Sequence, residues 1–145
     1  MHVELERVYA LETMPDTLWS ALRDAGRIAR CIPHAEDVRV EGNRLSAKVR
    51  PPYSFIRGRF SVDAEIVEVD EGGRRMSVMV KGSSIGSSFS AMLTISLVQD
   101  GLASTVTADT HGLLRTLPRS LVEKVVDDAM ERFLSCIRGD GAKEV

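Results

Sequence analysis

The sequence lacks the surplus of positive charge and the long apolar runs that mark several large classes of protein. Its 19 Lys and Arg residues are balanced by 21 Asp and Glu residues, which gives a formal net charge of −2. Nucleic-acid-binding domains gather basic residues on one face, so nucleic acid is not an expected partner. No apolar run of about 18 residues is present, and we expect no membrane-spanning helix.

Cysteine is also scarce, with Cys31 and Cys136 far apart in the chain. Spacing in sequence does not decide whether two cysteines pair, because a disulfide depends on geometry. No secretory signal is recognisable, so we expect a cytoplasmic protein in which both thiols are reduced. Neither the cysteines nor the three histidines show the paired spacing of metal ligands, and we expect no metal and no cofactor.

The composition that remains is that of one ordinary globular domain, and we expect residues 1–145 to fold as a unit. Alternating apolar residues predict a first strand over residues 2–11. Thr13 and Asp16 have the spacing of a capping box, with Pro15 in the first turn, and predict that a helix begins there. A second short helical segment should end at Pro33.

From residue 35 to residue 110 the apolar period is two, which is typical of antiparallel strands with one wet face. We expect a hairpin that turns at residues 41–43, a long strand over about 56–69, and three further strands. At Val67–Val69 the apolar phase slips by one residue, and this predicts a β-bulge. The small-residue run 82–88 lacks the lysine of a P-loop and precedes a strand, so it predicts a tight hairpin.

The segment 118–137 changes to helical period and carries one broad apolar stripe. At 1.5 Å per residue such a helix would be about 30 Å long, enough to cross a whole sheet. Gly139 is well placed to end it.

These elements predict an α+β fold in which a curved antiparallel sheet of about seven strands wraps around the long C-terminal helix. A curved sheet and a straight helix cannot touch along their whole length, so we expect a cavity between them. The alternative is a filled core, because periodicity reports burial and not empty space. The predicted cavity residues are Phe60, Val62, Ile66, Val78, Phe89, Leu93, Ile95, Val122, Val126, Met130 and Phe133.

Two loops rich in apolar residues should lie at the entrance of this cavity. We interpret them as a portal that touches ligand, membrane or partner; the alternative is that they pack over the end of the core. The predicted portal residues are Tyr53, Phe55, Leu113, Leu114 and Leu117.

Almost nothing charged points inward in this pattern, which favours non-catalytic binding of a hydrophobic small molecule over chemistry. No catalytic residue is assigned. The alternatives are an enzyme of the polyketide cyclase or hydratase kind, which would need Asp109, His111 and Tyr53 as its polar groups, and an interaction module with a filled core.

Several motifs resemble one family over nearly the whole chain. The stretches 18–24 and 29–33, together with 56–60, 82–90 and 107–109, resemble the carbon monoxide dehydrogenase CoxG family, which belongs to the START-like (SRPBCC) superfamily. The resemblance implies a helix-grip fold with a hydrophobic cavity. It also implies an accessory role beside a molybdenum-containing carbon monoxide dehydrogenase, with a lipid or quinone as ligand and the cytoplasmic membrane surface as a partner.

Overall fold

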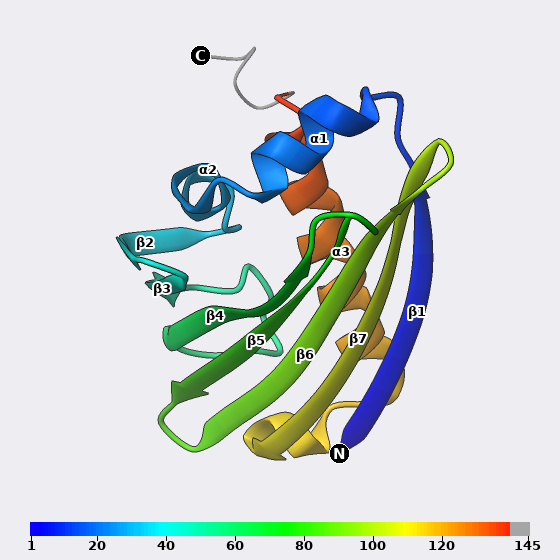
Figure 1. Cartoon of the computed structure of the whole chain (residues 1–145). Helices are drawn as coiled ribbons and strands as arrows, with labels where there is room; N and C mark the ends of the chain where they lie inside the picture. Colours follow the sequence, from blue (N-terminus) through cyan, green and yellow to red (C-terminus); the bar gives the residue numbers. More distant parts are fainter. Residues whose placement is uncertain (140–145) are drawn as a thin grey trace.

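The computed structural model describes residues 1–139 and contains one antiparallel sheet, one long helix and three short helical segments (Figure 1). The elements in chain order are β1 (His2–Ala10), α1 (Pro15–Leu22), α2 (Ala25–Arg30), β2 (Ala35–Glu41), β3 (Arg44–Val49), β4 (Phe60–Asp70), β5 (Arg75–Ser84), β6 (Ser87–Val98), β7 (Gly101–Gly112), the 3-10 helix η1 (Leu113–Thr116) and α3 (Arg119–Ile137). The predicted α+β class, helix-grip fold and seven strands are confirmed.

The seven strands lie in the order β1-β7-β6-β5-β4-β3-β2, so β1 and β2 form the two edges. Every neighbouring pair is antiparallel, and five of the six pairs join strands that are consecutive in sequence. The predicted bulge is present, because the β4–β5 register shifts between Ile66 and Glu68. Bulges bend a strand and increase its twist, which fits the curvature of the sheet around α3 (Figure 1).

Helix α3 crosses the concave face of the sheet, and α1 and α2 close one end of the space between them (Figure 1). Its bounds agree with the predicted segment, and Gly139 follows its end with a positive φ of 94°. The main core cluster joins Trp19 and Leu22 of α1, Met76 and Leu102 of the sheet, and the last turns of α3. A smaller cluster lies between β1, β7 and the first turns of α3.

Three local predictions are wrong. Helix α1 begins at Pro15 with Met14 as its N-cap residue, and no side chain caps it, so Thr13 and Asp16 do not form a capping box. Asp16 instead forms an ion pair with Arg74. The long central strand begins at Phe60, not near residue 56, because residues 53–58 form turns. The structure also contains η1, a single tight turn that the apolar period could not distinguish from a loop.

No helix within residues 1–139 is both long enough and apolar enough to span a bilayer.

Candidate ligand cavity

A cavity of about 570 Å³ lies between the sheet and the first half of α3. Ligand pockets for small organic molecules are typically about 300–1,000 Å³, so this space has the size of a binding site. Its wall comes from β3, β4, β6, β7, η1 and α3, and from the two connections that follow α2 and β3. The apolar lining residues are Ile32, Pro33, Val49, Pro51, Pro52, Ile56, Phe60, Val62, Phe89, Ala91, Val106, Ala108, Leu114, Leu117, Val122, Val125, Val126 and Ala129.

The floor of the cavity is made by small residues on the inner face of the sheet. Ala91 of β6 lies directly opposite Ala108 of β7, and both line the cavity. Nearby, Phe89 is paired with Gly82 of β5, and a side chain on Gly82 would lie 2.3 Å from the Phe89 ring. The ring therefore lies in the space that a side chain at position 82 would occupy. Short side chains here leave room that longer ones fill elsewhere along the same strands.

The polar groups of the lining lie mainly where α3 faces the loop between β3 and β4. The Tyr53 hydroxyl donates to Asp128 Oδ2 at 2.7 Å, and Lys124 Nζ donates to the same oxygen at 3.1 Å. Tyr53 also packs against Phe55, with 5.1 Å between the ring centroids. These contacts hold the loop against the helix. Glu131, Arg132 and His34 complete the rim, and all three are exposed.

The environment of this contact shifts both of its titratable groups. Burial, followed by the hydrogen bond to Asp128, raises the pKa of Tyr53 to about 12. The hydrogen bonds from Tyr53 and Lys124 lower the pKa of Asp128. At neutral pH the pair is therefore a neutral phenol that donates to a carboxylate, and neither group is placed to exchange a proton.

The structure places five of the eleven predicted cavity residues on the cavity wall: Phe60, Val62, Phe89, Val122 and Val126. The other six lie in the main core cluster and do not line the cavity: Ile66, Val78, Leu93, Ile95, Met130 and Phe133. They face the same side of the sheet or the same side of α3, but they lie nearer to α1, whose large side chains fill the gap. The apolar period identifies a face and does not identify a position along it.

Three of the five predicted portal residues line the cavity: Tyr53, Leu114 and Leu117. Phe55 does not line it and packs against Tyr53 instead. Leu113 has 67% of its surface exposed and lies outside the lining. The sequence analysis missed Val106, Ala108 and Thr110 of β7, although their short side chains on one face of the strand were a readable signal.

Of the three polar groups that an enzyme would need, only Tyr53 lines the cavity. Asp109 is on the outer face of β7, where its carboxylate lies 2.8 Å from Nδ1 of His2. His111 is exposed and follows the same outer face. Thr110, which does line the cavity, lies 3.4 Å from the Met1 carbonyl oxygen and donates to it.

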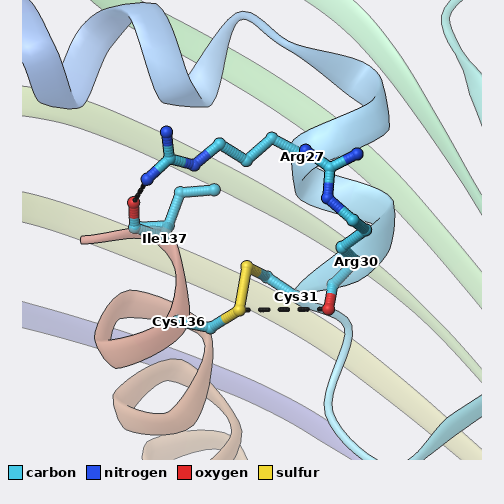
Figure 2. Close-up of a disulfide and its surroundings, with 5 residues drawn as sticks. All are labelled: Arg27, Arg30, Cys31, Cys136 and Ile137. Carbon is cyan, nitrogen blue, oxygen red and sulfur yellow. Dashed lines mark hydrogen bonds between the residues drawn. A yellow bond between two sulfur atoms is a disulfide. The ribbon is translucent and has the colours of Figure 1, made fainter. Parts of the chain in front are cut away.

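The expectation of two reduced thiols is wrong in this structure, because Cys31 and Cys136 form a disulfide (Figure 2). Cys31 ends α2 and Cys136 is in the last turn of α3, so the fold brings their Cα atoms to 5.5 Å across 105 residues of sequence. Beside it, Arg27 Nη2 donates to the Ile137 carbonyl oxygen at 2.8 Å. The next three residues after Cys31 line the cavity. The disulfide thus fixes one wall segment to α3.

Comparison with solved structures shows that this fold is shared by proteins of distant sequence. A conserved protein from Geobacillus kaustophilus has a TM-score of 0.79 at 17% identity, over 99% of this chain and 96% of that one. The ginseng major latex-like protein 151 from Panax ginseng has a TM-score of 0.66 at 13% identity, over 97% of each chain. Truncated norcoclaurine synthase from Thalictrum flavum has a TM-score of 0.61 at 12% identity, over 96% and 92%. Identities this low establish the fold alone.

No curated protein matches the chain. The carbon monoxide dehydrogenase CoxG family matches residues 10–140, which include all seven strands except most of β1, and the whole of α3. The matched range contains the cavity and both cysteines. The chain belongs to the carbon monoxide dehydrogenase CoxG family.

Proposed function

We propose that this chain binds an apolar small molecule, a lipid or a quinone, in the cavity without converting it. The observation that carries the proposal is a space of about 570 Å³ in which 18 of the 24 lining residues are apolar. Each square ångström of apolar ligand surface removed from water contributes about 25 cal/mol, so such a wall favours a hydrophobic occupant over a polar one.

The rim supports a ligand with one polar end. Arg132 has no ion-pair partner among residues 1–139, and it lies on the lining beside His34. A guanidinium is a donor with no acceptor capacity, so Arg132 suits a carbonyl or phosphate oxygen at the mouth. The apolar part of the ligand would then extend toward Ala91 and Ala108.

Family membership extends this proposal to an accessory role beside a carbon monoxide dehydrogenase-type molybdenum enzyme. The support is the family itself, together with a cavity of the right chemistry for a membrane-soluble electron carrier. Adding the purified chain to such a dehydrogenase should increase the rate at which the enzyme reduces a long-chain quinone. An unchanged rate would remove the accessory role and leave ligand binding standing.

Ligand binding is tested by extracting the purified protein with organic solvent and identifying the extract by mass spectrometry. The decisive variant is Ala108→Met, which places a long side chain in the cavity floor. Its matched control is Ala103→Met, on the same strand but on the opposite face of the sheet. We expect bound lipid or quinone in the wild type and in the control, and a loss of about tenfold in Ala108→Met. Empty extracts from all three proteins, with no thermal stabilisation by added quinone, would overturn the proposal.

A further inference from the structure

Three segments that are far apart in sequence meet at the end of the sheet opposite α1 and α2. The β5–β6 turn at Ile85–Gly86 contacts η1, because Leu113 N donates to the Gly86 carbonyl oxygen at 2.8 Å. The loop before β4 lies against the same turn, since a side chain on Gly58 would be 3.0 Å from Ser84 Oγ. In Figure 1 the β5–β6 turn and η1 lie together at the bottom of the view. We call this region the tip surface.

The tip surface exposes large apolar side chains that have no structural reason to be there. Ile85 is 99% exposed and Leu113 is 67% exposed. Ile85 is the central residue of a turn whose neighbours are only serine and glycine, so it protrudes with nothing beside it. Exposed apolar side chains scattered singly are ordinary, but two on adjoining turns form a patch that can enter an apolar phase.

Charge around this patch has one sign. Residues 53–61, 81–89 and 111–119 contain five Lys or Arg residues and no Asp or Glu, although acidic residues outnumber basic ones in the whole chain. Arg59 and Arg119 have partners in Glu36 and Glu123. Within residues 1–139, Arg57, Lys81 and Arg115 form no ion pair and remain available to an external anion.

We infer that the tip surface docks on a lipid bilayer that contains anionic headgroups, with Ile85 and Leu113 inserted and Arg57 and Arg115 on the phosphates. A bilayer fits better than an acidic protein, because a fully exposed isoleucine on a narrow turn needs no preformed pocket to enter acyl chains. Basic residues at an anionic surface each contribute about 1 kcal/mol, and apolar insertion adds to this.

The tip surface also adjoins the cavity. Ile56 and Leu114 line the cavity, and each is the sequence neighbour of an exposed tip residue, Arg57 and Leu113 respectively. A docked molecule would therefore hold this end of the cavity against the bilayer, and an apolar ligand would pass between the two without crossing bulk water. This passage rests on the proposed function, whereas docking itself does not.

Co-sedimentation of the purified chain with vesicles tests the inference. One set of vesicles contains phosphatidylcholine alone, and the other contains equal parts of phosphatidylcholine and phosphatidylglycerol. We expect binding to the second set only, with an affinity that falls as salt is raised because salt screens exposed charges. Ile85→Ser should weaken binding by about tenfold. Val8→Ser, which changes a 73% exposed aliphatic residue on β1, should leave it unchanged.

The charge is tested by the double variant R57E with R115E, against the double variant R39E with R75E, which changes net charge equally on exposed positions away from the tip. The first pair should abolish binding to anionic vesicles and the second should retain most of it. Equal loss in both pairs would reduce the effect to net charge and overturn a specific surface, as would binding to an acidic protein with none to vesicles. Ligand extraction from the same variants separates the two proposals: ligand without vesicle binding removes docking alone, and vesicle binding without ligand removes the proposed function alone.

Discussion

The two halves of α3 face the same sheet with opposite results. At the C-terminal half, Met130, Leu134 and Ile137 are buried against α1 and the core, whereas at the N-terminal half Val125, Val126 and Ala129 border the cavity. The sheet opposite the first group supplies Met76, Ile95 and Leu102, and opposite the second it supplies Gly82, Ala91 and Ala108. The hollow thus arises from a gradient of side-chain size along the strands, and not from curvature alone.

What closes the two ends also differs. The packed end is covered by α1, whose Trp19 and Leu22 fill the space over the sheet, and it is fixed by the disulfide between α2 and α3. The hollow end is covered by the β3–β4 loop and η1, and the loop is held to α3 through Tyr53 and Asp128. A protein that must admit a ligand keeps its stability at one end and its freedom at the other, as local stability is rarely uniform.

The largest effect should come from removing the disulfide at the packed end. Closing a loop of about 100 residues lowers the entropy of the unfolded chain by an amount equal to about 4.7 kcal/mol, and the Cys31–Cys136 separation is 105. Reduction by a dithiol should therefore lower the free energy of unfolding by about 4 to 5 kcal/mol in urea titrations. The variant C31S with C136S serves as control and should not respond to the dithiol. Two titratable thiols in the untreated protein would show that the bridge does not form.

A matched pair of leucine truncations compares the two halves directly. Leu134→Ala opens a new hole in the packed core and should lower the free energy of unfolding by about 2 to 5 kcal/mol. Leu117→Ala borders an existing cavity and is only half-buried, so no new hole forms and we expect about 1 kcal/mol or less. Chemical denaturation of both variants measures the difference. Equal losses would show that the hollow end is packed as tightly as the other.

The comparison also explains how far the sequence could lead. Periodicity predicted the strands, the bulge near Val67 and the long helix, because each depends on which residues share a face. The same reasoning placed Met130 and Phe133 on the cavity wall, since they share a face with Val122 and Val126 but lie on the packed half. Residue size along β6 and β7 carried the missing information.

Other features depend on geometry that no local pattern encodes. The disulfide requires α2 and α3 to meet, which follows only once the whole sheet has formed. The capping box at Thr13 failed because Pro15 begins the helix, while the Asp16 side chain pairs with Arg74 of the β4–β5 turn. A long-range ion pair thus replaced the local hydrogen bond that the spacing predicts.

The smallest effect concerns the Tyr53–Asp128 contact that closes the hollow end. The pKa of Tyr53 is raised from 10.0 to about 12, so folding favours its protonated form. The stability contributed by this shift is fully present below pH 10 and is lost as pH rises from 10 to about 12. For Asp128, whose pKa is lowered from 3.8, the contribution is present above pH 3.8 and is lost as pH falls through the lower folded value.

Titration of tyrosinate absorbance in Tyr9→Phe isolates Tyr53, because the chain has two tyrosines. We expect a midpoint near pH 12, and adding Asp128→Asn should lower it only in part, since burial is the larger cause and the hydrogen bond to Asp128 the next. Tyr53→Phe should flatten the dependence of unfolding free energy on pH between 10 and 12. A midpoint near pH 10 would mean that the loop is open and solvated, with the cavity uncovered on that side. A midpoint near 12 that rises further on addition of a quinone would mean that the ligand itself buries the tyrosine, because an apolar occupant at the mouth removes water from the phenol.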